Sequence, residues 1–395
     1  MRKRPRVAVA APGCGSGGSV GWVAAWHARE LGREFETALF SDSPPSGRGP
    51  YDFVPVDTPQ FRPLRRLSHV PREVAFAAGV GRALLRHYAP GEPMAVVCHG
   101  HVLTAVAGRA LNRRLGVAVL MVTHGDVFER PRGTYDATLT ALYKYASAVA
   151  YQDADAVIAL STAMAELAVR GGARPGRVFV VPNGVEPEAL GPAWDEPRPR
   201  PAATTRLQLL FVGRLAVEKG VEDLIEAVCI LEEEGHGVQL QIVGDGPEAA
   251  ALRKGIRDRF RHLVTFLGAR PKHELAQIYR ASDVVCVPSR SDSFPGVVLE
   301  ALACGVPVIG SRVGGIPDVV TEGTNGLLVP PGRPRQLASA IARVAGDKNL
   351  LASMEGAARG SVWPRFAWEE TGRQLRSVVA GVAGLGPEAG VVGGC

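Results

Sequence analysis

Two acidic residues, Asp292 and Glu300, lie eight positions apart where an apolar strand gives way to a helix. The apolar run 284–287 predicts the strand, the segment 297–304 (VVLEALAC) predicts the helix, and the loop 288–296 joins them. A helix N-terminus presents unpaired N–H groups and a partial positive charge, which attract phosphate. A carboxylate has two acceptor oxygens, so Glu300 could accept hydrogen bonds from two neighbouring sugar hydroxyls. The stretch therefore predicts a site for a phosphorylated, hydroxyl-rich ligand.

A second group of candidates is basic. Arg214 and Lys219 flank the turn between the predicted strand 207–212 and the helix that follows it. Two cations near the start of a helix would neutralise a diphosphate leaving group and stabilise the charge that develops on it. Solvated charges at an ordinary turn are the simpler alternative for this pair.

Polar side chains also follow three predicted strands in the first half of the chain, 94–98, 117–122 and 156–160. In an open parallel sheet, ligands bind at the edge formed by the carboxyl ends of the strands. The candidates at this edge are His99, His101, His124, Asp126 and Ser161. A lone histidine is usually structural, and the histidine spacings match no standard zinc pattern, so no metal site is predicted from them.

The pair Asp153 and Asp155 has the Asp-x-Asp form that can hold a divalent cation. Both acids precede the strand 156–160, which puts them at its amino end, away from the edge where ligands bind. We therefore predict a structural role for them and expect neither a metal nor a cofactor to be required.

Composition limits the class of protein. The chain has 395 residues and a formal charge of +6, which suggests two domains and fits a phosphate-bearing ligand or an anionic surface. No basic–aromatic stripe or nucleic-acid motif is present, so no nucleic-acid partner is expected. No apolar run approaches the roughly 20 residues that a spanning helix needs. The six cysteines lack metal-ligand or CxxC spacing, which indicates free thiols in a reducing compartment and predicts a cytoplasmic protein.

Strands and helices alternate in both halves of the chain, which predicts an α/β fold of two doubly wound, Rossmann-like domains facing a cleft. The Pro-rich segment 191–201 has the composition of a linker. We expect an N-terminal domain over 1–190 and a C-terminal domain over 200–362. The segment 41–66 is rich in Pro, Gly and Ser and predicts a long surface loop.

The chain resembles the retaining GT-B glycosyltransferases of glycosyltransferase family 4. The resemblance rests on the acid-x7-acid spacing of Asp292 and Glu300, on Arg214 and Lys219, and on the Pro-Asn-Gly-Val tetrapeptide 182–185. It is strong over 206–331 and looser before 182. Asp292 stands where the family usually has Glu, which is one methylene longer.

The resemblance implies a role for each matched residue. Glu300 would hold the nucleotide ribose, Asp292 the hydroxyls of the donor sugar, and Arg214 with Lys219 the diphosphate. His124 would lie beside the donor sugar and the acceptor. Further donor contacts are implied for Gly17, Gly18, Gly244, Arg270, Phe294, Pro295, Gly296 and Val297, and acceptor-side contacts for His99, His101, Asp126 and Ser161.

The implied reaction moves a hexosyl group from a nucleotide-diphosphate donor, most commonly a UDP-sugar, to an acceptor hydroxyl with retention at the anomeric carbon. The nucleotide sugar is a co-substrate held by the C-terminal domain. The acceptor is a small natural product, a cell-envelope precursor or a lipid-linked molecule, so peripheral membrane contact stays open. A last helix, about 366–385, would cross back and pack on the N-terminal domain.

Three alternatives stay open. The chain could be another GT-B enzyme, such as a nucleotide-sugar epimerase or a hydrolase, or a non-catalytic protein that binds nucleotide sugars. The glycines of PGCGSGG (12–18) match GxGxxG loosely and suggest a nicotinamide dehydrogenase. No acid is clearly placed after the second strand to bind its ribose, and Asp42 is the nearest.

Overall fold

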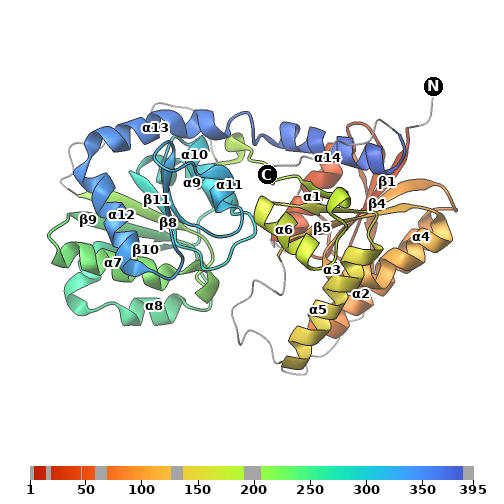
Figure 1. Ribbon diagram of the computed structural model, residues 1–395, viewed down its shortest axis with the longest axis horizontal. Coiled ribbons are helices and arrows are strands. Elements are labelled where there is room, and N and C mark those ends of the chain that lie inside the picture. The colour runs from red at the N-terminus through yellow and green to blue at the C-terminus, as the bar shows by residue number, and fades with distance from the viewer. Residues whose placement is uncertain are drawn as a thin grey trace. The chain divides into compact units, whose positions relative to one another are not determined.

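The computed structural model describes residues 4–14, 19–45, 47–57, 69–125, 137–190 and 206–385 (Figure 1). Contacts divide the chain into two compact units. Unit 1 comprises the described residues within 1–183 and 368–395, and unit 2 comprises the described residues within 184–367. Each unit is built on one parallel sheet, so the predicted α/β fold with two doubly wound domains is confirmed.

The described part of unit 1 contains a seven-stranded sheet in the order β3-β2-β1-β4-β5-β6-β7, with every pair parallel. The strands are β1 Arg6–Ala10, β2 Glu36–Ser41, β3 Asp52–Pro55, β4 Pro93–His99, β5 Ala118–Thr123, β6 Ala156–Ala159 and β7 Val178–Val180. The helices are α1 Ser19–Leu31, α2 His69–His87, α3 His101–Leu103, the π-helical η1 Thr104–Gly108, α4 Arg109–Leu115, α5 Ala137–Asp153, α6 Thr162–Arg170 and α14 Trp368–Val382. The strand order reverses between β1 and β4, the arrangement that places a ligand-binding crevice at the carboxyl ends of these strands.

The described part of unit 2 contains a six-stranded sheet in the order β10-β9-β8-β11-β12-β13, again all parallel. The strands are β8 Leu207–Val212, β9 Val238–Val243, β10 Val264–Gly268, β11 Val284–Val287, β12 Val308–Ser311 and β13 Gly326–Val329. The helices are α7 Val221–Glu233, α8 Ala249–Gly255, α9 Leu275–Arg280, α10 Gly296–Ala303, α11 Ile316–Val319, α12 Pro334–Gly346 and α13 Lys348–Val362. Short 3-10 turns complete the two units, at Pro175–Arg177, Pro187–Leu190, Val217–Lys219 (η6), Asp258–Leu263 and Lys272–Glu274.

Both sheets are covered by helices, which explains the character of their strands. A strand that is buried on both faces consists of a continuous apolar run instead of an alternating one. Strands β6 (AVIA) and β11 (VVCV) are of this type, and all of their residues are buried. The five cysteines among the described residues are free and buried. None of the described helices is long and apolar enough to cross a membrane.

One expectation about the course of the chain needs correction. The segment 41–66 is not a loop throughout, because β3 pairs with β2 at the edge of the first sheet. An edge strand of four residues that ends in Pro carries little apolar periodicity, so the pattern did not predict it. The contacts divide the chain at Asn183, before the expected residue 190, since the turn Pro187–Leu190 packs against α10 in unit 2.

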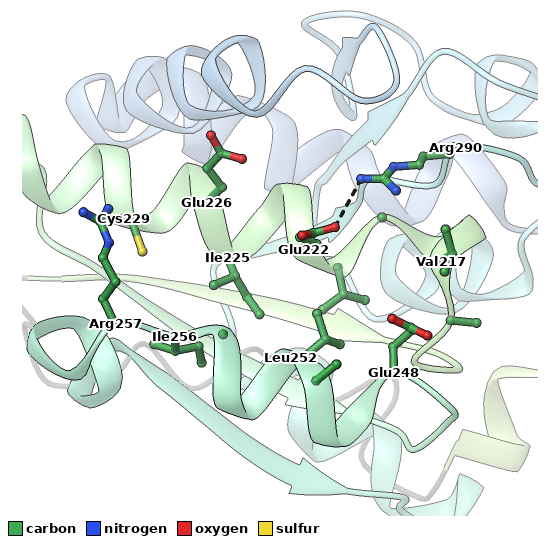
Figure 2. A pocket seen from close by; sticks show the side chains of 15 residues that line it. Val217, Glu222, Ile225, Glu226, Cys229, Glu248, Leu252, Ile256, Arg257 and Arg290 are labelled. Atoms are coloured by element: carbon green, nitrogen blue, oxygen red, sulfur yellow. Dashed lines mark ion pairs between the residues drawn. The ribbon is translucent and has the colours of Figure 1, made fainter.

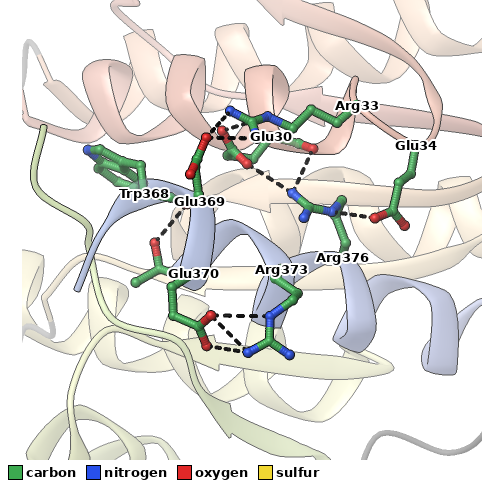
Figure 3. Close-up of polar contacts among 9 residues, drawn as sticks. Glu30, Arg33, Glu34, Trp368, Glu369, Glu370, Arg373 and Arg376 are labelled. Carbon is green, nitrogen blue, oxygen red and sulfur yellow. Dashed lines mark hydrogen bonds and ion pairs between the residues drawn. The ribbon is translucent and has the colours of Figure 1, made fainter. Parts of the chain in front are cut away.

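Helix α14 is attached to α1 by an ion-pair cluster (Figure 3). The guanidinium of Arg376 donates to Glu30 Oε2 at 2.9 Å and to Glu34 Oε1 at 2.8 Å. The Glu30 side chain is 1% exposed and that of Arg376 is 10% exposed. At the start of α14, the ring of Trp368 stacks on Trp26 with centroids 5.1 Å apart. This cluster holds residues far apart in the sequence together in unit 1.

Candidate functional site

Two loops of unit 2 meet at the carboxyl ends of neighbouring strands and bring a cation and an acid together. The loop after β8 carries Lys219, and the loop after β11 carries Asp292. The ammonium of Lys219 lies 2.5 Å from Asp292 Oδ2. The hydroxyl of Ser289 donates to the same oxygen at 3.2 Å. The backbone N–H of Arg290 donates to the carbonyl of Glu218 at 2.8 Å, which ties one loop to the other.

A third loop, after β12, fixes the backbone of Asp292. Gly314 has φ +51°, and a Cβ on it would lie 1.4 Å from the carbonyl oxygen of Asp292. The N–H of Gly315 donates to the carbonyl of Ser293 at 3.0 Å. Only glycine permits this approach, so the sequence VGG at 313–315 positions the first acid.

Helix α10 begins where this loop ends. Phe294 is buried and its ring lies 6.1 Å from that of Phe366, which anchors the entry to the helix. Pro295 is the N-cap, and no side chain caps the helix there. Gly296 is exposed and Val297 is half-buried, so the first turn of the helix is accessible to a ligand. The uncapped N–H groups at this end can bind an anion.

Glu300, in the second turn of α10, is held by two partners. The hydroxyl of Tyr279 donates to Glu300 Oε2 at 2.9 Å, and the ammonium of Lys272 lies 3.7 Å from Oε1. Tyr279 is fully buried, and this burial, with the adjacent Glu300 carboxylate, raises the pKa of Tyr279 well above its ordinary value. The phenol therefore stays protonated and fixes the direction of the Glu300 carboxylate.

The remaining donor-side candidates share one edge of the sheet. Arg214, Gly244, Arg270 and Asp292 follow β8, β9, β10 and β11, which are consecutive in the order β10-β9-β8-β11. The exposed guanidinium of Arg214 lies 2.5 Å from the carboxylate of Glu218. Gly244 has φ +133°, and a Cβ there would lie 1.8 Å from the carbonyl oxygen of Gly213. This glycine is thus required by the close approach of two turns.

In unit 1, the histidines predicted at the ends of β4 and β5 lie together. Nδ1 of His99 and Nε2 of His124 are 2.8 Å apart. His99 is 1% exposed, whereas His124 is half-buried. Burial lowers the pKa of His124 to about 3 and that of His99 well below its ordinary value, and the histidine neighbours lower both further. Both imidazoles are therefore neutral at neutral pH.

The other predicted residues of unit 1 have structural contacts or lie outside the described residues. His101 Nε2 lies 3.3 Å from the hydroxyl of Thr123. Ser161, predicted as a site residue, is fully buried, and its Oγ accepts from the N–H of Met164 at 3.2 Å, so it caps α6. Its burial and its cap bond explain why a serine is needed there without a ligand. The predicted residues outside the described ranges are Gly17, Gly18 and Asp126.

The two acids that have the Asp-x-Asp form are engaged by the fold. Asp153 Oδ1 accepts from Nη2 of Arg109 at 2.5 Å. Asp155 Oδ2 accepts from the N–H of Val119 at 2.8 Å, which joins the helix–strand junction to β5. In the described part of the chain, no group of three or more His, Cys, Asp or Glu side chains has the arrangement of a metal site.

A cavity of about 300 Å³ lies between α7 and α8 of unit 2 (Figure 2). It is lined by the apolar side chains of Ile225, Leu252 and Ile256 and by the charged residues Glu226 and Arg257, among others. None of the predicted site residues lines it. Its lining includes Val217 of the turn η6 and Arg290 of the loop after β11, but neither Lys219 nor Asp292.

Comparisons with known proteins identify the family. Residues 193–361 match the model of the glycosyl transferases group 1, and residues 20–189 match that of Glycosyltransferase Family 4. A D-inositol 3-phosphate glycosyltransferase of Actinosynnema mirum is 33% identical over 76% of this chain and 75% of its own length. The chain belongs to glycosyltransferase family 4.

Solved structures agree on the fold of this family 4 glycosyltransferase. Sucrose-phosphate synthase from Thermosynechococcus elongatus has a TM-score of 0.77 at 22% identity, covering 94% of this chain and 97% of that one. The Anabaena protein HepE, in complex with UDP-glucose, has a TM-score of 0.72 at 19% identity, covering 95% of this chain and 99% of that one. These likenesses establish the two-domain GT-B fold.

Sequence reasoning missed the residues that hold the candidates in place. Tyr279 and Lys272 orient Glu300, Ser289 donates to Asp292, and His27 packs on His99 with ring centroids 5.0 Å apart. No motif marks these residues: Tyr279, Lys272 and His27 belong to different elements from their partners, and Ser289 lies in the same loop as Asp292. A buried tyrosine hydroxyl and a buried histidine need polar partners, and that requirement is the one signal that a sequence alone could offer.

Proposed function

We propose that this glycosyltransferase moves a hexosyl group from a UDP-sugar to a hydroxyl of a small, soluble acceptor, with retention at the anomeric carbon. One observation carries the proposal. Lys219 contacts Asp292 at an edge of unit 2 that also carries Arg214 and leads into the uncapped N-terminus of α10, with Glu300 one turn inside. Cations, an acid pair and a helix N-terminus are the groups that a diphosphate-sugar requires.

Each residue has a role in this proposal. Glu300, aligned by Tyr279, accepts hydrogen bonds from the two ribose hydroxyls of the donor. Arg214 and Lys219 bind the diphosphate and stabilise the negative charge that grows on it as the sugar departs. Asp292 accepts a hydrogen bond from a hydroxyl of the donor sugar, and its hydrogen bond with Lys219 holds that cation in place.

The bonds that change are few. The bond between the anomeric carbon and the diphosphate oxygen breaks, and a bond from that carbon to the acceptor oxygen forms on the same face. The proton of the acceptor hydroxyl passes to an oxygen of the departing diphosphate. No second carboxylate of the proposed donor site is needed as a covalent nucleophile, in contrast to the retaining glycosidases. No metal enters the scheme, because the two cations neutralise the leaving group.

Support for the acceptor and the base comes from relatives. The Actinosynnema mirum protein is named for D-inositol 3-phosphate, a small polyhydroxylated anion, and this chain carries a formal charge of +6. The HepE structure contains UDP-glucose and shares only the fold with this chain. We assign the donor to unit 2 and the acceptor to unit 1, with the cytoplasm as the compartment.

A thermal-shift screen of UDP-, GDP- and ADP-sugars, followed by a transfer assay on inositol phosphates and other small polyols, tests the proposal. A ligand that binds only the folded state raises its stability with the logarithm of ligand concentration, so the correct donor should stand out. We expect Lys219→Ala to lower transfer by about 10²- to 10³-fold, the scale of one lost transition-state contact. Lys254→Ala, an exposed lysine on α8, is the matched control.

Four outcomes would contradict parts of the proposal. Equal turnover in Lys219→Ala and Lys254→Ala would refute the site. Cleavage of the donor without any acceptor would identify a hydrolase, and donor binding without turnover over the whole acceptor panel would identify a binding protein. A product with an inverted anomeric centre would refute retention.

A further inference from the structure

Four aromatic rings from four elements of unit 1 form a continuous row. Trp368, at the start of α14, lies edge-on to His27 of α1, with centroids 6.3 Å apart. His27 lies 5.0 Å from His99, the last residue of β4. His99 stacks on His124, which follows β5, with centroids 5.0 Å apart and an interplanar angle of 28°. The row therefore connects the C-terminal helix to the predicted catalytic histidine.

The three rings of this row other than His124 are buried. His27 is 2% exposed, His99 is 1% exposed and Trp368 is 4% exposed, so none of the three can reach a ligand directly. The acceptor-side role predicted for His99 therefore does not fit its burial. Its one hydrogen bond to another ring joins Nδ1 to Nε2 of His124 at 2.8 Å. Through this contact His99 can fix the ring of His124.

The direction of that hydrogen bond follows from the other nitrogen of His99. Among the described residues, His99 Nε2 is buried and has no hydrogen-bond partner. If His99 carried its proton on Nε2, a buried N–H would be unpaired, and such orphaned donors are rarer in proteins than unpaired acceptors. His99 therefore carries its proton on Nδ1 and donates it to Nε2 of His124. His124, a neutral ring whose Nε2 accepts, then carries its own proton on Nδ1.

We propose that His99 is a positioning residue for His124, which fixes its ring orientation and its Nδ1–H tautomer, with His27 and Trp368 bracing His99 from behind. The proposal deepens the proposed function, because it rests on the transfer reaction and on the place beside the donor sugar and the acceptor that the family resemblance implies for His124. A histidine whose ring is fixed by a partner presents its N–H in one direction, and a donor there suits an oxygen of a sugar or phosphate. In a Ser-His-Asp triad, the aspartate that is hydrogen-bonded to the histidine selects the histidine tautomer in the same way.

Nuclear magnetic resonance of the ligand-free protein tests the tautomer without any assay of activity. Protein labelled with ¹⁵N-histidine is compared with His99→Leu and His99→Asn in long-range ¹H–¹⁵N correlation spectra at pH 7.5. We expect His124 of the wild-type protein to be protonated at Nδ1 alone, and to become a mixture of tautomers in His99→Leu. Protonation of wild-type His124 at Nε2, or an unchanged spectrum in His99→Leu, would overturn the proposal.

Kinetics with the same variants test positioning. The side-chain amide of asparagine reaches the place of Nδ1, so His99→Asn can keep the hydrogen bond that His99→Leu loses. Outer-shell partners of functional histidines in metal sites contribute about 10- to 100-fold, and we expect a fall in kcat of that order in His99→Leu. The KM for the donor should stay unchanged, since Glu300, Arg214 and Lys219, the residues proposed to hold the nucleotide and the diphosphate, belong to unit 2. His99→Asn should recover kcat to within a few-fold of the wild-type value.

The exposed His87 on α2 provides the control variant, His87→Asn. Thermal melting shows whether each variant folds, and if His99→Leu does not, His99→Asn and the wild-type spectrum still decide the question. Wild-type kcat in folded His99→Leu, or an equal loss in both His99 variants, would overturn the proposal. Failure of the wild-type protein to transfer any sugar would instead refute the proposed function, and the spectra would still report the tautomer.

Discussion

Replacing His27 by glutamine should reduce the sensitivity of unit 1 to acid. His27 is 2% exposed, and burial, with the nearby His124, lowers its pKa from 6.5 to about 3. In the unfolded chain the imidazole is in water and binds a proton below a pH of about 6.5. Between these two pKa values the unfolded state binds one more proton than the folded state. The stability that His27 contributes is therefore complete above pH 6.5 and is lost as the pH falls towards 3.

The size of the effect follows from linkage. At pH 5 the unfolded imidazole lies about 1.5 pH units below its pKa, and each unit corresponds to about 1.4 kcal/mol. Wild-type protein should thus lose about 2 kcal/mol through His27 between pH 7.5 and pH 5. His27→Gln has a side chain that does not titrate at this position, so it should lose about 2 kcal/mol less over the same interval. Carboxylates and the other histidines contribute to both proteins, and their effects cancel in the difference.

Urea unfolding followed by tryptophan fluorescence measures this difference. Three of the five tryptophans in the chain, Trp22, Trp26 and Trp368, form one cluster in unit 1, and Trp368 also contacts His27. The signal therefore reports the unit in which the histidine lies. The control is a further measurement at pH 8.5, where the His27 imidazole is neutral in the folded and in the unfolded wild-type chain. The difference in stability between the two proteins should be the same there as at pH 7.5. Parallel losses of stability in the two proteins between pH 7.5 and pH 5 would refute the assignment of a buried, neutral His27.

Three further predictions follow from the contacts above. Arg376→Ala should lower the free energy of unfolding by about 3 kcal/mol, because it leaves the buried Glu30 carboxylate without its closest cation. Arg373→Ala, on the exposed face of α14, should have a much smaller effect, because an exposed ion pair is screened by solvent; equal urea midpoints of the two variants would contradict this. Gly314→Ala should displace the backbone of Asp292 by about 1 Å and lower transfer about 10²-fold. The cooperative unfolding of unit 1 should stay unchanged, and full activity in this variant would contradict the close approach of Gly314 to the Asp292 carbonyl. Treatment with a chelator should leave transfer unchanged, and a loss that a divalent cation restores would contradict the metal-free scheme.

The sequence alone was sufficient for the fold class and for buried strands of unit 2 such as β8 and β11. Runs such as VVCV and LQLLFV are apolar because strands of a parallel sheet are buried on both faces, and this local pattern survives without knowledge of the neighbours. The acid spacing from Asp292 to Glu300 is likewise local, since a loop and one turn of a helix separate the two residues. The edge strand β3 escaped prediction because half-exposed residues at a sheet edge carry no such pattern.

Only the tertiary structure decided which side chains meet. The 2.5 Å contact of Lys219 with Asp292 depends on β8 and β11 being neighbours in the sheet, although 73 positions separate the two residues. The row from Trp368 to His124 joins α14 to β5 in the same way, and Tyr279 reaches Glu300 from another helix. Long-range contacts of this kind are set by strand order and helix packing, and the periodicity of apolar residues in the sequence does not determine either of them. The sequence therefore specifies the chemical groups, and the packing of the sheets determines their partners, their protonation and their direction.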